Sequence, residues 1–191
     1  MIKSTLLMAL ISVSTVISQE FVVENDMRLK EGDPYYQHID ITYNHKISEH
    51  FTPFVGYRFI NENKKKWEHF SRFHTGFHLT AKVGPSTVAA RSRLEYTPNW
   101  NLKSDDLTFR ERVKISPFTV GQTVKYSPYV FDEVFFGVSN RAGYNRDRLG
   151  VGLDIKFNNS VSLEPYYFAE FRESLHWKSA NIFGLIMKVK F

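Results

Sequence analysis

Apolar and polar residues alternate with a period of two along much of this chain, most clearly at its carboxyl end. The odd positions of residues 181–191 are apolar: Phe183, Leu185, Met187, Val189 and Phe191. Several even positions are small or charged: Gly184, Lys188 and Lys190. A period of two places the two sets on opposite faces of a β-strand. The last segment is therefore predicted to be an amphipathic strand that ends on an aromatic residue.

The same alternation recurs in earlier segments that are separated by polar or turn-forming residues. These segments are residues 21–29, 35–47, 51–60, 67–81, 88–96, 107–115, 121–136, 148–157 and 161–171. In the clearest of them, Leu149 and Val151 alternate with Arg148 and Gly150. The pattern predicts an all-β fold with about ten antiparallel strands.

The connections between these segments alternate in length. Counted back from the carboxyl end, the long ones are residues 172–179, 137–147, 97–106 and 61–66. The short ones are residues 158–159, 116–118, 84–85 and 48–50. Transmembrane β-barrels have short periplasmic turns and longer outer loops. Trp67, Trp100 and Trp177 lie in or beside the long connections, where an aromatic girdle is expected. We therefore predict an antiparallel transmembrane β-barrel of about ten strands.

A soluble β-sandwich or a lipocalin-like barrel would also alternate apolar and polar residues. Neither explains the ordered loop lengths or the aromatic carboxyl terminus. The aromatic content of 16% and the mean hydropathy of −0.33 fit a chain in which lipid-facing and lumen-facing residues alternate. The transmembrane barrel is therefore the preferred interpretation.

The amino end has the features of a secretory signal peptide. Lys3 is followed by an apolar run over residues 6–17, which is too short to span a bilayer as a helix. We predict a cleaved signal peptide over residues 1–18 and a single barrel domain over residues 19–191. The expected location is the outer membrane of a Gram-negative bacterium. There, Phe191 resembles the terminal aromatic signal that the barrel-insertion machinery reads.

The formal net charge of +5 and the pI of about 9.3 would suit a nucleic-acid binder. However, the basic residues are spread along the chain, and an exported protein seldom meets nucleic acid, so no such partner is expected. The absence of cysteine excludes a disulfide framework and a thiolate metal site. The sequence does not indicate an oligomeric state.

Charged residues gather on the faces that a barrel would turn inward. The predicted lumen charge network comprises Arg58, Arg72, Arg91, Arg93, Glu95, Arg110, Arg112, Asp132, Arg148, Asp154, Glu164 and Glu170, with Lys114 and Lys156 beside them. A barrel of this size has a narrow interior, and buried charges must pair. We predict a charge-filled lumen and a non-enzymatic binding, structural or minor transport role. A basic pore or an anion-binding cavity is the alternative for the lumen.

Histidines suggest two further kinds of site. His74 and His78 share the inward face, but Arg72 would repel a cation, so neither a metal nor a cofactor is expected.

His69 and Ser71 share the outward face, and some outer-membrane lipid hydrolases have a similar His-x-Ser on a lipid-facing strand. A histidine so placed can take the serine proton. No third, orienting residue is evident, since Asn61, Glu62 and Asn99 are only loop neighbours. A lipid hydrolase that uses His69 and Ser71 is therefore the alternative function.

Basic residues in the expected outer loops are candidates for lipid contact. Lys64, Lys65, Lys66, Arg141 and Arg146 lie in or beside the long connections. Solvated loops are often charged, and such side chains can also bind the phosphates of lipopolysaccharide. The expected partners are outer-membrane lipids, including lipopolysaccharide.

Three groups of residues, taken in order, resemble a known family. They are Arg91-x-Arg93-x-Glu95, then Pro128-Tyr129 with Asp132-Glu133-x-Phe135, then Asn145-Arg146 with Arg148-Leu149-Gly150-Val151-Gly152-Leu153. Together they resemble an uncharacterised outer-membrane barrel family that is catalogued as a domain of unknown function. Here Asp147 separates Arg146 from Arg148, so either arginine can match the family pattern. The resemblance implies a barrel over nearly the whole mature chain and no particular activity.

Overall fold

The computed structural model describes residues 18–63, 66–98, 105–139, 143–173 and 178–191. These residues form ten strands. They are β1 (Ser18–Lys30), β2 (Asp33–Lys46), β3 (Phe51–Asn63), β4 (Trp67–Val83), β5 (Ser86–Thr97), β6 (Asp106–Ser116), β7 (Lys125–Gly137), β8 (Gly143–Lys156), β9 (Val161–Arg172) and β10 (Lys178–Lys190). Each predicted segment corresponds to one strand. The predicted signal peptide lies outside the described residues except for Ser18, which is the first residue of β1.

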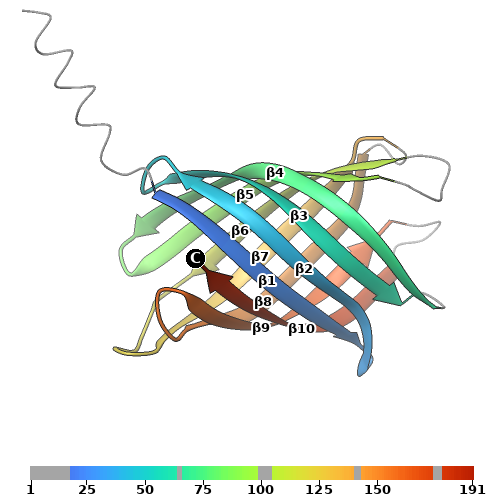
Figure 1. Cartoon of the computed structure of the whole chain (residues 1–191). Coiled ribbons are helices and arrows are strands. Elements are labelled where there is room, and N and C mark those ends of the chain that lie inside the picture. Colours follow the sequence, from blue (N-terminus) through green and yellow to red (C-terminus); the bar gives the residue numbers. More distant parts are fainter. Residues whose placement is uncertain (1–17, 64–65, 99–104, 140–142, 174–177) are drawn as a thin grey trace, which may run out of the picture.

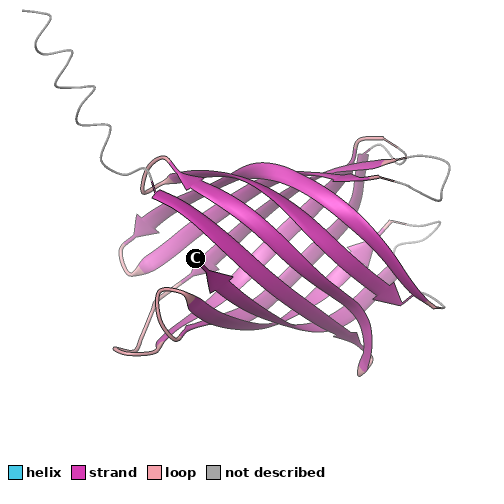
Figure 2. Cartoon of the chain, viewed as in Figure 1, coloured by secondary structure: helices cyan, strands magenta, loops and turns pink. Residues whose placement is uncertain are grey.

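The ten strands close into one barrel in which every neighbouring pair is antiparallel (Figures 1 and 2). The seam lies between β1 and β10, where Val22 is opposite Lys190 and Lys30 is opposite Ile182. The backbone N–H of Phe191 donates to the carbonyl of Phe21 over 2.9 Å. Closure leaves no strand edge without a partner, which is what a sheet surrounded by lipid requires. The predicted all-β barrel is confirmed.

The connections follow the predicted alternation with three differences. β3 ends at Asn63 and β4 begins at Trp67, so the connection between them, which was expected to be long, is shorter than the one between Lys46 and Phe51. The first hairpin turns within two residues, Glu31 and Gly32, although it lies at the end of the barrel that carries the long connections. The turn expected at residues 116–118 instead runs from 117 to 124, because β7 begins at Lys125 and not at residue 121. Gly121, with φ of 100°, allows a small loop that an isolated bridge between Val120 and Tyr126 closes.

The two faces of the sheet have opposite chemistry. Large apolar side chains cover the outside, such as Leu149 at 61% exposed and Phe59 at 57%. The interior holds buried charged residues, together with a small core formed by Tyr129, Phe131, Tyr166, Phe168, Ile182 and Ile186. An apolar exterior around a polar interior is the reverse of a soluble globular protein and is typical of membrane barrels.

Glycines on the inner face lie opposite aromatic rings on the neighbouring strand. Gly150 is opposite Phe131, and a Cβ added at Gly150 would lie 2.5 Å from that ring and 2.6 Å from the carbonyl oxygen of Tyr167. Gly184 faces Tyr166 in the same way. The missing side chains leave room for bulky rings to lie across the sheet, which fills a narrow interior.

Replacing Gly150 by valine should destabilise the barrel, because the new side chain would overlap Phe131 and the backbone of Tyr167. We expect a loss of about 1–3 kcal/mol in the free energy of unfolding, measured by urea titration of the protein in detergent micelles. The control is Val151→Leu on the outward face, which should change stability little. Equal stability of Gly150→Val and the natural protein would contradict this packing.

Candidate functional site

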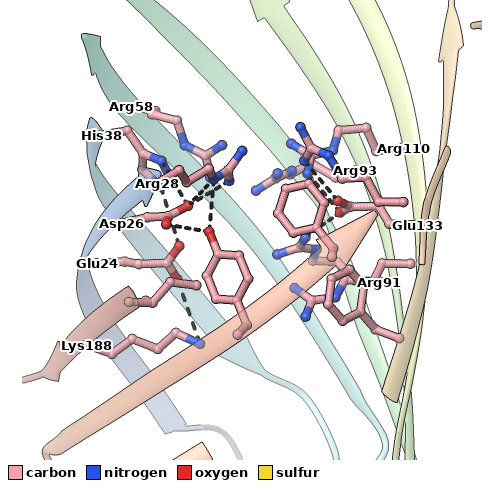
Figure 3. A pocket seen from close by; sticks show the side chains of 16 residues that line it. Glu24, Asp26, Arg28, His38, Arg58, Arg91, Arg93, Arg110, Glu133 and Lys188 are labelled. Carbon is pink, nitrogen blue, oxygen red and sulfur yellow. Dashed lines mark hydrogen bonds and ion pairs between the residues drawn. The ribbon is translucent and has the colours of Figure 1, made fainter. Parts of the chain in front are cut away.

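The barrel lumen is the most highly charged region of the molecule and is the candidate site. Figure 3 shows its middle, where Asp26, Arg28 and His38 lie on one side and Arg93, Arg110 and Glu133 on the other. The buried ionisable residues are Asp26, Arg28, His38, Asp40, Arg58, His74, Arg93, Glu95, Arg110, Glu133, Arg148, Glu164 and Glu170. Because the strands alternate in and out, the inward residues of each strand, including the charged ones, lie at every second position.

Glu95 on β5 is shared by arginines from four strands. Its carboxylate lies 2.7 Å from Arg72 on β4 and 2.7 Å from Arg93 on β5. Arg110 on β6 also donates to it, and Arg58 on β3 lies 3.9 Å away. Glu95 is only 2% exposed, so bulk water contributes little to its solvation. The four guanidinium groups are what compensate for burying this carboxylate.

Glu133 on β7 forms a second centre. Its carboxylate lies 2.8 Å from both Arg91 and Arg110 and 3.3 Å from Arg148. Arg110 therefore bridges Glu95 and Glu133, and the two centres form one continuous network along the inner wall from β3 to β8.

Two more carboxylates form ion pairs on the side of the lumen that β1, β2 and β3 line. Asp26 pairs with Arg28 over 2.6 Å. Asp40 pairs with Arg58, and its other oxygen lies 3.0 Å from Nε2 of His74. The contacts of Asp40 join β2, β3 and β4, and Nδ1 of His38 on β2 lies 3.5 Å from Asp26 on β1, so the network extends around the wall.

Glu164 and Glu170 on β9 complete the set. Glu164 lies 3.1 Å from Lys114 and also pairs with Lys188. Glu170 lies 2.6 Å from Nε of Arg148 and also pairs with Arg172. The Glu164 cluster lies toward the end with the carboxyl terminus and the Glu170 cluster toward the opposite end. Ion pairs therefore span the length of the lumen.

Aromatic rings separate cations that would otherwise repel one another. The guanidinium carbons of Arg110 and Arg148 lie 4.4 Å and 4.7 Å from the centre of the Phe135 ring. Arg112 lies 4.3 Å from the ring centre of Phe131. Such cation–π contacts add attraction where carboxylates are fewer than arginines.

The structure places eleven of the twelve predicted network residues on the inner face. Asp132 is the exception: it is exposed on the outer face, and Glu133 occupies the inward position instead. The error arose because β7 turns Tyr129, Phe131 and Phe135 inward. On that strand, aromatic side chains therefore do not mark the lipid-facing side. Asp154 faces inward near Lys156, at a distance of 3.8 Å.

The pattern read from the sequence did not assign to the network the charges of β1 and β2, nor Glu133 on β7 and Lys188 on β10. Missed network members are Glu24, Asp26, Arg28, His38, Asp40, Glu133 and Lys188. Asp26 and Arg28 are two residues apart, as are His38 and Asp40. The period of two that was used for the later strands would have found both pairs.

The inward histidines are explained by the network and by aromatic contacts. His74 contacts Asp40, as above, and the ring of His78 lies 4.7 Å from that of Phe54. Within the described ranges, no group of three or more His, Asp or Glu side chains is placed to hold a metal ion.

The outward His69 and Ser71 each have a polar partner on β3. Nδ1 of His69 lies 2.6 Å from Oδ1 of Asn61, and these residues are direct cross-strand neighbours. The hydroxyl of Tyr57 donates to Oγ of Ser71 over 2.7 Å. Asn61 belongs to β3 and not to a loop, so it is a direct partner of His69 and not only the loop neighbour that the sequence predicted.

The remaining predicted positions lie at the ends of the strands. Trp67 begins β4 and is 46% exposed. Arg146 is not a loop residue but lies in β8 on the lumen side, with its guanidinium 4.8 Å from the ring centre of Phe135. Phe191 is 77% exposed at the seam. Lys64, Lys65, Asn99, Trp100, Arg141 and Trp177 lie outside the described residues.

The described part of the chain has no helix that is long and apolar enough to cross a membrane. No curated protein sequence matches the chain. Solved structures match its fold over most of its length. LpxR from Salmonella typhimurium aligns with a TM-score of 0.50 and 8% identity, over 82% of this chain and 74% of that one.

Two autotransporter domains are also similar. The beta domain of the Bordetella autotransporter Brka aligns with a TM-score of 0.50 and 9% identity, over 91% of this chain and 98% of that one. The translocator domain of NalP from Neisseria meningitidis has a TM-score of 0.44 and 11% identity, over 100% of this chain and 95% of that one. At such low identity, the likenesses to LpxR and Brka show the barrel fold alone.

The sequence itself matches a family over most of its length. Residues 9–178 match the family described as "Protein of unknown function (DUF2490)". This match includes all three groups of residues on which the predicted resemblance rested. The chain belongs to the DUF2490 family.

Proposed function

We propose that the protein is an outer-membrane β-barrel of a Gram-negative bacterium whose lumen is closed by ion pairs, and that its role is binding or structural and not general transport. The observation that carries this proposal is the shared network around Glu95 and Glu133, in which inward carboxylates and arginines of six consecutive strands, β3 to β8, contact one another. An unpaired charge in a narrow lumen would be costly. Opening a pore would therefore require several pairs to break together.

The remaining space in the middle of the lumen supports closure. The cavity lined by Glu24, Asp26 and Arg93, among others, has a volume of about 60 Å³. This space holds a few water molecules and not a hydrated solute. Conduction of sugars or amino acids through the barrel does not fit this geometry.

The outer membrane is the environment that the exterior suits best. The exposed apolar side chains that surround the barrel would be stabilised by lipid and destabilised by water. In this account, outer-membrane lipids surround the barrel, and the terminal Phe191 is read by the barrel-insertion machinery during assembly.

The proposed location predicts where the protein is recovered. The full chain should fractionate with outer membranes and migrate differently on gels before and after boiling. Deletion of Phe191 should reduce the inserted fraction. The control is Phe157→Leu, which replaces another exposed aromatic residue, in a turn, and should not reduce it. Recovery of the natural protein as a soluble periplasmic monomer would contradict the proposal.

Closure of the lumen predicts low conductance. Purified protein reconstituted in planar bilayers should show no large, steady channels, while a general porin prepared in the same way should show them. Replacing Glu95 and Glu133 together by alanine should increase current, because two shared carboxylates would be lost. Large, steady channels in the natural protein would refute a closed lumen.

The contact between Asn61 and His69 favours a second candidate function, lipid-ester hydrolysis. Asn61 can accept a hydrogen bond from Nδ1 of His69, which leaves Nε2 free to act as a base. Ser71 lies two residues away on the same face. Tyr57, beside Ser71, has a hydroxyl that could donate to a developing oxyanion.

The chemistry of this candidate is acyl transfer in two steps. Ser71 Oγ would bond to the ester carbonyl carbon as His69 takes its proton, and the lipid alcohol would leave with that proton. Water would then release the fatty acid from Ser71 by the same sequence. The exposed rings of Phe59 and Phe73 beside the site would suit acyl chains.

The two candidates predict different results in an esterase assay. Hydrolysis requires that protein in detergent release fatty acid from phospholipid or lipopolysaccharide, and that Ser71→Ala, His69→Ala and Asn61→Ala each reduce the rate at least about a hundredfold. Ser92→Ala, another outward serine, serves as the control. The closed-barrel proposal predicts no fatty-acid release above that of detergent without protein. An unchanged rate in Ser71→Ala would remove this site from consideration.

A further inference from the structure

A second cavity lies in the lumen toward the end with the long connections. Its volume is about 230 Å³, and seven of its twelve lining residues are arginines. It is formed by the beginning of β2 at Tyr35 and Tyr36, the end of β3 at Glu62, and the end of β9 at Arg172. In the proposed orientation, this arginine-lined mouth faces outward from the cell.

Two carboxylates that form ion pairs with arginines of the mouth, Glu170 and Glu95, are each shared among several arginines. Glu170 pairs with both Arg148 and Arg172, and Glu95 pairs with Arg72 and Arg110 as well as with deeper arginines. Sharing leaves positive charge that is not fully compensated. Tightly grouped guanidinium groups of this kind attract and orient anions.

Arg146 differs from the other arginines of the mouth. It lies at the mouth on β8 and makes no ion pair among the described residues, and its Nε atom is buried without a hydrogen-bond partner. Its guanidinium lies beside the ring of Phe135, which Arg148 and Arg110 also contact. Arg146 is half-buried, and a guanidinium group in a narrow lumen without an anionic partner is unfavourable, so its position favours a bound anion.

The exposure of the side chains shows how an anion could enter. The side chain of Arg172 is 44% exposed and that of Arg72 is 20% exposed, whereas that of Arg148 is only 6% exposed. The mouth is therefore reached from water and becomes more enclosed with depth. Guanidinium groups bind phosphate oxygens in pairs, and the cavity has room for a phosphate group with water.

We propose that the arginine-lined mouth binds a phosphate group, either as free phosphate or as part of a lipid headgroup. The free anion could bind whichever way the barrel is oriented, but the lipid source rests on the proposed function, because it needs the mouth to face the outer leaflet. The arginines would bind and hold the group, and no reaction is assigned to them.

The test measures binding of inorganic phosphate to the full chain in detergent micelles by calorimetry. The natural protein should bind phosphate saturably. Arg146→Gln should weaken binding at least about tenfold, while Arg146→Lys, which keeps the charge, should weaken it less. Arg172→Gln is a second variant at a more exposed position. The control is Lys156→Gln, since Lys156 lies at the opposite end and is half exposed.

A second arm identifies the source of the phosphate group. Vesicles that contain lipopolysaccharide, before and after phosphatase treatment, compete with inorganic phosphate for the protein. Stronger competition by the untreated vesicles would assign the site to a lipid headgroup, and equal competition would assign it to the free anion.

The absence of saturable phosphate binding, or equal binding by the natural protein and folded Arg146→Gln and Arg172→Gln variants, would overturn the site. Migration before and after boiling shows whether each variant is folded. Failure of this proposal is distinct from failure of the proposed function. A conducting barrel that binds phosphate would refute only closure, and a closed barrel that does not bind it would refute only the site.

Discussion

The pairing of charges in a narrow lumen is the constraint on which the rest of this structure depends. A ten-strand barrel has little room for water, so each inward charge must find an opposite charge within reach. Glu95 and Glu133 meet this requirement together, since each is shared by several arginines and Arg110 contacts both. The network therefore cross-links β3 to β8 on the inner face, and the pair of Lys114 with Glu164 joins β6 to β9.

The other features of the barrel fit around this network. Inward glycines such as Gly150 leave space for aromatic rings, which fill the lumen and lie against guanidinium groups. Apolar side chains are left for the outside, where lipid can cover them. Charge is less well balanced at the mouth, where Arg146 has no carboxylate partner among the described residues.

Much of the fold could be predicted from the sequence, because a period of two is a local property. It located all ten strands and assigned most inward charges. It misplaced Asp132, since β7 turns aromatic residues inward and both of its faces read as apolar. The contacts themselves could not be predicted. The bond between Asn61 and His69 depends on the register of β3 against β4, and the approach of Arg58 to Glu95 depends on barrel closure. Neither the register nor the closure geometry is encoded in a single segment.

The most direct test compares the free energies of unfolding of Glu95→Gln and Asp132→Asn. Both are measured by urea titration in lipid vesicles. Both changes neutralise one carboxylate, but only Glu95 is shared by buried arginines. We predict a loss of about 3–5 kcal/mol for Glu95→Gln, because it leaves those charges uncompensated. Asp132→Asn, on the outer face, should change stability by less than about 1 kcal/mol. Equal stability of the two variants would contradict the claim that ion pairs in the lumen hold the barrel together.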